Sequence, residues 1–328
     1  MHINIDNNRY QKMPYHKVGN SGLYLPAISL GLWHNFGEEK PFDEARRMVL
    51  TAFNHGVTHF DLANNYGNPP GSAEKTFGKI LSEDLNEHRN ELIISTKAGF
   101  RMWDGPYGEG SSRKYLLSSL DDSLKRMNLD YVDIFYSHRY DEHTPLEETM
   151  GALSDAVKLG KALYIGLSNY PYDKLKEAID ILKDLGTPPI LYQGKFNIID
   201  QTIKETNILE LCMKEGIGII PFSPLHQGVL TDKYLEGIPE DSRMRMAGTI
   251  TEDEWKQLQD KVSLLDTVAN KEDMALSEMA LRYVLSTPNI PSAIVGVSSI
   301  EQLNKNLDVA KRPRLEKPLK ERIEAIIK

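Results

Sequence analysis

Short apolar runs alternate with longer amphipathic stretches along this chain. Eight runs of four to seven residues are almost continuously apolar, a pattern typical of parallel strands that are covered on both faces. These expected strands are Ala27–Gly31, Thr58–Asp61, Leu92–Lys97, Val132–His138, Ala162–Ser168, Ile190–Gln193, Gly218–Ser223 and Ala293–Gly296.

The stretches between the runs have apolar residues at helical spacing. In the stretch that ends at Met127, leucines at 116, 117, 120 and 124 mark one helix face. A repeated strand-then-helix order predicts a parallel α/β sheet. The expected helices are Glu44–His55, Tyr115–Met127, Leu146–Leu159, Tyr172–Leu185, Asn207–Glu215 and Ile300–Ala310.

About eight such repeats in 328 residues favour an α/β fold of the (β/α)8 TIM-barrel type. The rival is an open doubly wound sheet, which usually carries the glycine pattern G-x-G-x-x-G where it binds a dinucleotide. The nearest match, Gly216–Pro221, lacks the third glycine and leads into a strand. We therefore expect one barrel domain over residues 1–328, without an interdomain linker.

Several segments fall outside the eight repeats. Lys17–Leu23 predicts an N-terminal hairpin around a glycine turn. Extra C-terminal helices are expected at Glu252–Asn270, Ser277–Leu285 and Leu319–Ile327. The segment Leu230–Thr251 is long and polar, and a loop of this kind after a barrel strand usually has a functional role.

Composition narrows the class of protein. The chain is 40 % hydrophobic and 26 % charged, with a net charge of −8. These values are typical of a globular protein and disfavour a nucleic-acid partner. No apolar run approaches the ~20 residues of a membrane span, and the N-terminus does not resemble a signal peptide. Cys212 is the only cysteine and is expected in the core, so we expect a cytoplasmic protein without disulfides.

Titratable residues stand at the ends of three neighbouring expected strands. Asp61, Lys97 and His138 end the second, third and fourth strand, and Tyr66 follows Asp61 by five residues. In a barrel, the C-terminal strand ends meet at one mouth, where active sites are built. Taken singly, each residue has a simpler explanation as a turn former or a solvated group. Together they combine an ion pair with a proton donor.

The chemistry that this group suggests is proton donation to a carbonyl oxygen during its reduction. Tyr66 is the candidate general acid, although a tyrosine pKa of about 10 is high for this task. We expect cationic Lys97 to lower that pKa, and Asp61 to provide the counter-charge for a buried lysine. A neutral His138 would hydrogen-bond the substrate carbonyl and orient it.

In order and context, these four residues resemble the tetrad of the aldo-keto reductase family. The matching stretches are Ser29–Gly37, Phe60–Gly67, Leu92–Gly99 and Tyr131–Arg139, and the resemblance extends over most of the chain. It is strongest to the branch that reduces L-glyceraldehyde 3-phosphate, and the potassium-channel β-subunits are similar as well. The resemblance implies NADPH-dependent reduction of small aldehydes, such as this compound or methylglyoxal, to alcohols.

The resemblance also implies where the cofactor NADPH binds. Three strand-end residues would hold the nicotinamide carboxamide, one aromatic ring would stack on the nicotinamide, and later loops would contact the phosphates and the adenosine. Without the resemblance, core packing or a solvated loop would explain the same residues. The implied cofactor-binding residues are Trp33, Asp61, Ser168, Asn169, Gln193, Phe222, Ser223, Pro224, Leu225, Gln227, Gly228, Lys233, Arg243, Gly296, Ser298, Gln302 and Asn306.

Two positions depart from the common family pattern. Many members carry arginine where Gln302 stands, whereas the glyceraldehyde phosphate branch and the channel subunits carry glutamine. NADP preference over NAD therefore rests partly on analogy. Gly194 and Lys195 follow Gln193, where proline is more common, and a change in backbone shape or in charge near the cofactor is expected.

The small-molecule substrate is expected to contact Trp33, Tyr66 and His138. Further aromatic residues lie in the loops after the first and third strands, and nearby arginines are candidates for binding a substrate phosphate. A solvated loop explains these arginines equally well. The additional aromatic candidates are His34, Trp103 and Tyr107, and the arginines are Arg101, Arg113 and Arg139.

Two other classes of function remain open. One is a cofactor-binding regulatory module similar to the channel β-subunits, although those typically carry asparagine where His138 stands. The other is a metal-dependent hydrolase that uses Asp61, Asp133 and His138. The odd spacing of Asp133 and His138 on one strand places them on opposite faces, so no metal site is predicted. The resemblance makes a homo-oligomer, a tetramer or larger, a further expectation.

Overall fold

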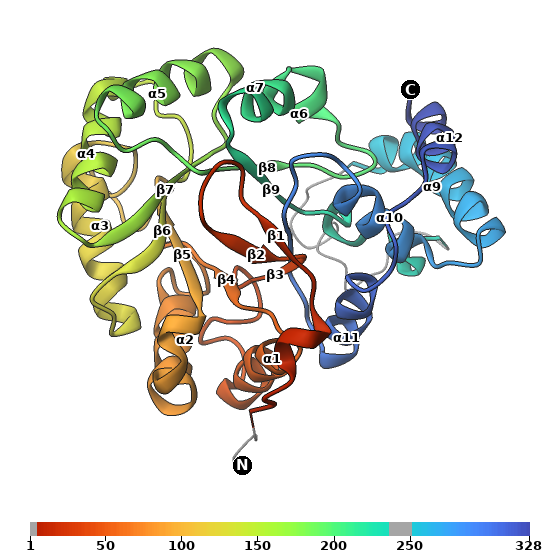
Figure 1. The fold of residues 1–328 in the computed structure, drawn as a ribbon, viewed down its shortest axis with the longest axis horizontal. Coiled ribbons are helices and arrows are strands. Elements are labelled where there is room, and N and C mark those ends of the chain that lie inside the picture. The colour runs from red at the N-terminus through yellow and green to blue at the C-terminus, as the bar shows by residue number, and fades with distance from the viewer. Residues whose placement is uncertain (1–4, 236–250) are drawn as a thin grey trace.

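Eight parallel strands form a barrel in the computed structural model, which describes residues 5–235 and 251–328 (Figure 1). Their order is β10-β3-β4-β5-β6-β7-β8-β9, so the last strand of the chain pairs with the first strand of the barrel. This confirms the predicted TIM barrel. The strands are β3 (Ile28–Gly31), β4 (His59–Asp61), β5 (Ile93–Ala98), β6 (Val132–Ser137), β7 (Ala162–Ser168), β8 (Leu191–Lys195), β9 (Gly218–Phe222) and β10 (Ala293–Val295).

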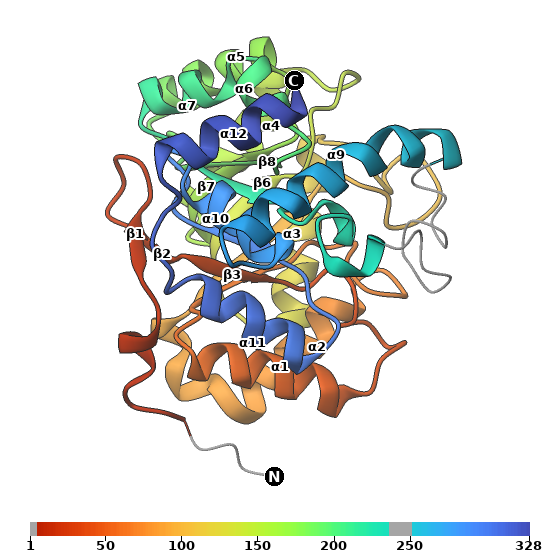
Figure 2. The same cartoon turned by 90° about the vertical axis from the view of Figure 1, so that its right-hand side faces the viewer.

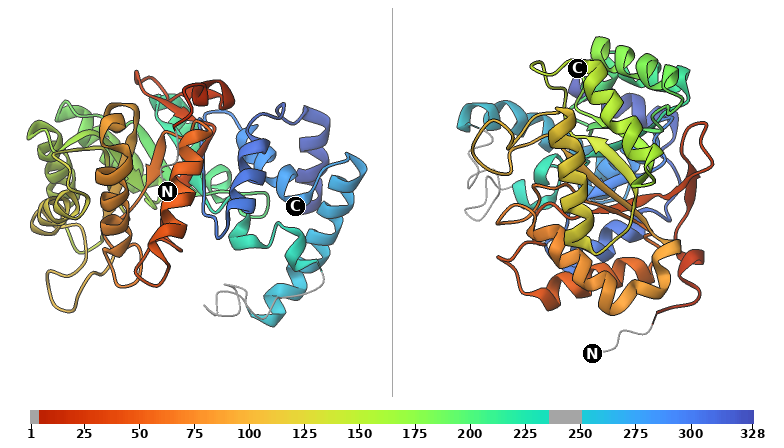
Figure 3. Two further views of the ribbon diagram at one scale, coloured as in Figure 1. Left: turned by 90° about the horizontal axis from the view of Figure 1, so that it is seen from below. Right: turned by 90° about the vertical axis from the view of Figure 1, so that its left-hand side faces the viewer.

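Helices surround the strands on the outside, as Figures 2 and 3 show. The extra C-terminal helices α9, α10 and α12 gather at one side of the barrel in Figure 1, which confirms the three expected helices. The helices are α1 (Phe42–Asn54), α2 (Ser72–Ile80), α3 (Arg113–Met127), α4 (Leu146–Lys158), α5 (Tyr172–Asp184), α6 (Thr202–Glu205), α7 (Ile208–Glu215), α9 (Glu252–Lys271), α10 (Leu276–Leu285), α11 (Ile300–Val309) and α12 (Lys317–Ile327).

The sequence pattern did not predict α2, which carries a glycine in its interior. A glycine at such a position costs ~1 kcal/mol of helix stability relative to alanine. A Cβ atom at Gly78 would lie 2.6 Å from Cα of Met127 on α3 and 2.7 Å from the carbonyl oxygen of Arg126. The glycine therefore permits close packing of α2 against α3, and tertiary contact outweighs helix propensity.

The predicted hairpin is present and closes the floor of the barrel. β1 (Tyr15–Lys17) pairs antiparallel with β2 (Tyr24–Pro26). Val18 and Leu25 belong to the same buried cluster as Ile134 and Ile220 from the barrel strands. In Figure 1 the hairpin crosses the centre of the barrel. Because this end holds the N-termini of the strands, the opposite end is left open as the mouth.

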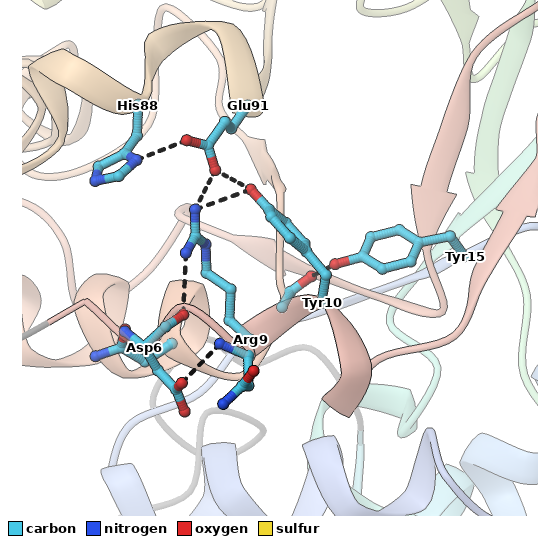
Figure 4. A network of polar contacts seen from close by, with 9 residues as sticks. Asp6, Arg9, Tyr10, Tyr15, His88 and Glu91 are labelled. Atoms are coloured by element: carbon cyan, nitrogen blue, oxygen red, sulfur yellow. Dashed lines mark hydrogen bonds and ion pairs between the residues drawn. The ribbon is translucent and has the colours of Figure 1, made fainter.

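A polar network ties the N-terminal segment to the barrel wall (Figure 4). Arg9 is buried, pairs with Glu91, and stacks on the rings of Tyr10 and Phe53 at 4.4 and 4.7 Å. Glu91 also accepts hydrogen bonds from Tyr10 and His88. Burial opposes ionisation of Glu91, but the hydrogen bonds from His88, Tyr10 and Arg9 outweigh it and lower its pKa to about 2.

Replacing Glu91 by glutamine is predicted to destabilise the fold at neutral pH, because buried Arg9 loses its ionic partner. The expected loss is only about 1–2 kcal/mol, since Glu91 is itself partly exposed to solvent. The depressed pKa stabilises the fold above the unfolded-state pKa of about 4.3 and loses this effect as pH falls toward 2. Thermal melts should therefore separate wild type from Glu91→Gln at pH 7, less so at pH 3, and bring them together only near pH 2 and below. A constant separation would contradict this role.

No helix in the described part of the chain is long and apolar enough to cross a membrane. Cys212 on α7 is fully buried, which confirms its predicted place in the core. Burial raises the pKa of its thiol to about 12.

Candidate active site

The four predicted tetrad residues meet at the open end of the barrel. Asp61 ends β4, Lys97 lies near the end of β5, His138 directly follows β6, and Tyr66 lies in the loop after β4. The Nζ atom of Lys97 is 2.6 Å from Oδ2 of Asp61 and 5.0 Å from the centre of the Tyr66 ring. The rings of Tyr66 and His138 are 5.8 Å apart. The arrangement expected from the strand ends is therefore present.

The backbone around Tyr66 fixes its position relative to the strands. Its carbonyl oxygen accepts hydrogen bonds from the N–H groups of Gly71 and Ala73, at 3.1 and 3.2 Å. Gly67 has a φ of +82° and donates its N–H to the carbonyl of Trp33. Glycine adopts this left-handed conformation without strain. The turn thus ties the tyrosine to the ends of β3 and α2.

Lys97 and Asp61 form an ion pair that is almost completely shielded from solvent. Their side chains are 0 % and 2 % exposed. Lys97 also donates to the carbonyl oxygen of Leu62 at 2.6 Å. Burial lowers the pKa of Lys97, and the charge and hydrogen bond of Asp61 oppose that shift. A cation buried at such a site depends on its partner, because an unpaired charge there is strongly destabilising.

The expectation that the pKa of Tyr66 lies below its usual value is wrong. Burial raises the Tyr66 pKa well above its usual value, and the negative charge of Asp61 acts in the same direction. Asp61 neutralises Lys97 at contact distance, whereas the ring of Tyr66 lies farther away. The phenol consequently stays protonated through neutral pH, which is the form that a proton donor requires.

His138 is held as a neutral imidazole. Burial lowers its pKa well below the usual value, and the charges of Lys97 and Arg139 add to this effect. Its Nδ1 atom is buried and has no hydrogen-bond partner among the described residues. Phe100 packs edge-on against the ring at 4.6 Å. The neutral ring expected from the sequence is therefore what the surroundings impose.

Asp61 has further partners that sequence reasoning did not identify. Its Oδ1 atom accepts hydrogen bonds from Oγ of Ser95 at 2.8 Å and from Nε2 of Gln193 at 3.1 Å. Oγ of Ser95 also lies 3.0 Å from Nε2 of buried His59. The two-residue spacing of His59 and Asp61 on β4, and of Ser95 and Lys97 on β5, was an available signal, because alternate strand residues share one face.

The residues expected at the nicotinamide carboxamide lie together beside this group. Ser168 ends β7 and Gln193 lies on β8, and both side chains are buried. Asn169 has a φ of +55°, and its Nδ2 atom donates to the carbonyl of His138 and to Oγ of Ser168, both at 3.1 Å. An amide-rich cluster is suited to the donor and acceptor of a carboxamide. These residues fit a nicotinamide group.

The loop after β9 has the tight backbone expected where a pyrophosphate is wrapped. Ser223 and Gln227 both have positive φ, as does Gly228. Phe222 is only partly buried at the end of β9, so its ring is not simply core. The cofactor candidates in this segment are Phe222, Ser223, Pro224, Leu225, Gln227 and Gly228.

The structure explains the two unusual residues after Gln193. A Cβ atom at Gly194 would lie 2.6 Å from the ring of Tyr192, so the position has no room for a side chain. Lys195 pairs with Asp200 at 3.0 Å. Close packing therefore accounts for the glycine, and the lysine charge is compensated locally.

The segment expected at the adenosine end begins α11. The side-chain oxygen of Gln302 accepts hydrogen bonds from the N–H and hydroxyl of Ser298, at 3.0 and 2.9 Å. Gln302 therefore satisfies the donors that a phosphate would use. Gly296 precedes these residues and Asn306 is buried on the same helix. Lys233 is exposed, and Arg243 lies outside the described residues.

The candidate aromatic residues and arginines for substrate binding differ in their surroundings. Trp33 is 49 % exposed and stacks on Tyr66, with ring centres 6.0 Å apart. Trp103 and Tyr107 are also exposed. Arg139 carries its guanidinium 4.6 Å from the ring of Phe100.

The three candidate arginines all have carboxylate partners. Arg113 pairs with Asp155 on α4 at 2.6 Å, Arg101 pairs with Asp104 in its own loop, and Arg139 pairs with Glu109 at 3.2 Å. Arg139 is the one that directly follows His138 in the chain, and it is therefore the best placed to meet a substrate at the mouth.

Asp133 has a structural role that separates it from the mouth. It pairs with Arg89 at 2.9 Å and accepts the backbone N–H of Ile94 at 2.8 Å. It stands near the start of β6, whereas His138 follows the end of that strand. Within residues 5–235 and 251–328, no group of three or more His, Cys, Asp or Glu residues is arranged to hold a metal ion.

Comparison with known proteins identifies relatives over most of the chain. Residues 27–328 match the model of the aldo/keto reductase family. L-glyceraldehyde 3-phosphate reductase of Escherichia coli O157:H7 is 49 % identical over 308 residues, which cover 91 % of this chain and 88 % of that protein. A probable voltage-gated potassium channel subunit beta of Arabidopsis thaliana is 36 % identical over 306 residues, 90 % of each chain.

A solved structure supports the fold. The holo form of an aldo-keto reductase from Bacillus halodurans superimposes with a TM-score of 0.80 over 96 % of this chain and 97 % of its own, at 24 % identity. With the family model matched over nearly the whole barrel and the mouth built as described, the chain belongs to the aldo/keto reductase family of oxidoreductases.

Proposed function

We propose that this protein reduces small aldehydes, among them L-glyceraldehyde 3-phosphate and methylglyoxal, to alcohols with NADPH as hydride donor. The observation that carries the proposal is the buried Lys97–Asp61 pair beneath Tyr66, beside a neutral His138. These groups form a proton donor and a carbonyl-binding group at one point of the barrel mouth. The identity to L-glyceraldehyde 3-phosphate reductase supports the substrate class.

In this proposal, bound NADPH supplies a hydride to the carbonyl carbon. Ser168, Asn169 and Gln193 hold the carboxamide of the cofactor. His138, as a neutral ring, orients the carbonyl oxygen. The oxygen that gains the electron pair takes the phenolic proton of Tyr66, and the tyrosinate regains a proton from water.

Lys97 acts on the anionic form of Tyr66. The ammonium group lies 5.0 Å from the ring centre and stays charged through its pair with Asp61. A cation at this distance stabilises a tyrosinate more than a phenol, so it lowers the cost of proton donation at the moment when donation occurs. The raised resting pKa of Tyr66 and this role are compatible, because the resting phenol is the required reactant.

The cofactor contacts, and NADPH in place of NADH, stay part of the proposal. A 2′-phosphate at the start of α11 requires that the side chain of Gln302 release Ser298. The freed N–H and hydroxyl groups are then available to an anion at a helix N-terminus. A homo-oligomer, a tetramer or larger, is likewise proposed from the family resemblance, and light scattering in solution tests its size. A cytoplasmic location is proposed from the sequence features given above.

Replacing Tyr66 by phenylalanine is predicted to lower kcat for glyceraldehyde 3-phosphate by at least about 10²-fold, because a positioned general acid contributes ~10²–10⁴ in rate. The measurement is NADPH oxidation followed by absorbance, with NADH tested alongside. NADPH affinity, measured by fluorescence titration, should change little. Wild-type protein that binds NADPH but turns over neither glyceraldehyde 3-phosphate nor methylglyoxal would instead favour a regulatory module.

Arg139 is predicted to contribute to recognition of a substrate phosphate. Its side chain is 39 % exposed and its guanidinium lies against Phe100, where a phosphate can replace Glu109 as its partner. Replacing Arg139 by methionine should raise KM for glyceraldehyde 3-phosphate by about tenfold and leave KM for methylglyoxal unchanged. Arg113→Met is the matched control, since Arg113 pairs with α4. Equal effects on both substrates would overturn this assignment.

A further inference from the structure

A chain of buried hydrogen bonds crosses the interior of the barrel and ends on Asp61. It begins at Ser292, before β10, and passes through Ser29 on β3, His59 on β4 and Ser95 on β5. The successive distances are 2.6, 2.8, 3.0 and 2.8 Å. All five residues are at most 1 % exposed.

The direction of every hydrogen in this chain follows from the carboxylate at its Asp61 end and from a neutral ring at His59. An ionised Asp61 only accepts, so Ser95 uses its single hydrogen to reach Oδ1. Ser95 must then accept from Nε2–H of His59. A neutral imidazole carries one N–H, so its Nδ1 accepts from the hydroxyl of Ser29. Ser29 accepts in turn from Ser292.

The surroundings of His59 exclude the alternative in which the ring is cationic. Burial lowers its pKa to about 4, and the positive charge of Lys97 also opposes protonation, while Asp61 favours it. A cationic ring would donate from both nitrogen atoms. The ring is therefore neutral at physiological pH, and the carboxylate selects its tautomer through Ser95.

The end of this chain is also the point at which two other functional contacts meet. Oδ1 of Asp61 accepts from Ser95 and from Gln193, while Oδ2 binds Lys97. Oγ of Ser95 thus fixes the rotation of the carboxylate that sets the direction of the lysine and of a carboxamide-binding residue. Outer-shell partners of this kind orient functional groups without touching substrate.

We propose that His59 is a positioning residue, which in its Nε2–H form locks Ser95 as the donor to Asp61 and thereby aligns Lys97 under Tyr66. The catalytic consequence rests on the proposed function, whereas the tautomer does not. Neither residue contacts substrate in this proposal. Hydrogen bonds that all run in one direction toward an anion reinforce one another, so loss of one link is felt at the carboxylate.

The tautomer is tested without turnover. Spectra of the cofactor-free protein labelled with ¹⁵N-histidine, assigned with His59→Gln, report which ring nitrogen carries the proton. We expect His59 to stay neutral and protonated at Nε2 from pH 5 to 9. A proton on Nδ1, or a titration near pH 6.5, would overturn the proposed chain even if the enzyme is active.

The positioning role is tested by kinetics on the full-length protein. Ser95→Ala should lower kcat for glyceraldehyde 3-phosphate reduction by about 10–100-fold with little change in KM. His59→Leu should behave like Ser95→Ala. His59→Gln should restore most of kcat, because its amide N–H can donate to Ser95 and its carbonyl can accept from Ser29.

Thr96→Val is the matched control. Thr96 is the next residue on β5 and its buried hydroxyl also binds a carboxylate, that of Glu74, but on the outer side of the strand. Its kcat should match wild type, with any loss confined to thermal stability. Should His59→Leu fail to fold, Ser95→Ala and His59→Gln decide the case.

The positioning role would be contradicted by an unchanged kcat in Ser95→Ala, or by a kcat of His59→Gln as low as that of Ser95→Ala. If instead the wild-type protein reduces no aldehyde, the proposed function fails and the ¹⁵N result alone decides whether the directed chain exists.

Discussion

The ion pair between Lys97 and Asp61 is the constraint on which the rest of the site depends. A lysine with no solvent exposure keeps its charge only if an anion lies in contact with it. Asp61 meets that need, and its second oxygen is held by Ser95 and Gln193. The barrel contributes by bringing the ends of β4, β5 and β8 to one mouth, where these groups converge.

The same pair accounts for the contrasting protonation of its neighbours. His138 is kept neutral by burial, with Lys97 acting in the same direction, so it can donate one hydrogen bond to a carbonyl oxygen. Tyr66 stays a protonated phenol because burial and Asp61 raise its pKa. A reductase needs a neutral histidine and a protonated tyrosine before the reaction begins. The ammonium group of Lys97 then stabilises the tyrosinate that forms when the phenol loses its proton.

Sequence periodicity predicted the barrel because the strands are buried apolar runs, several of which have polar residues at the C-terminal end. It did not find α2, since Gly78 lowers helix propensity and only the approach of α3 explains it. The tetrad could be assembled from strand ends alone. The direction of the Tyr66 pKa shift could not be predicted, because it depends on distances between groups that the sequence does not supply.

The contact between Ser95 and His59 could not be predicted from the sequence either, although the two-residue spacing of each from a tetrad residue was visible. An inward-facing His on a strand is compatible with many partners. Only the register between β3, β4 and β5 shows that Ser29, His59 and Ser95 are adjacent. The cofactor residues, in turn, were placed by resemblance, and the structure adds that the side chain of Gln302 occupies the N–H and hydroxyl of Ser298.

The most direct test of this account is the single-turnover rate of NADPH oxidation by saturating aldehyde in Asp61→Asn, measured by stopped flow at pH 7. The asparagine keeps the shape and removes the charge that holds Lys97 protonated. With NADPH also saturating, the account predicts a rate at least about 10²-fold below wild type. A rate within a few-fold of wild type would show that the buried ion pair does not drive proton donation.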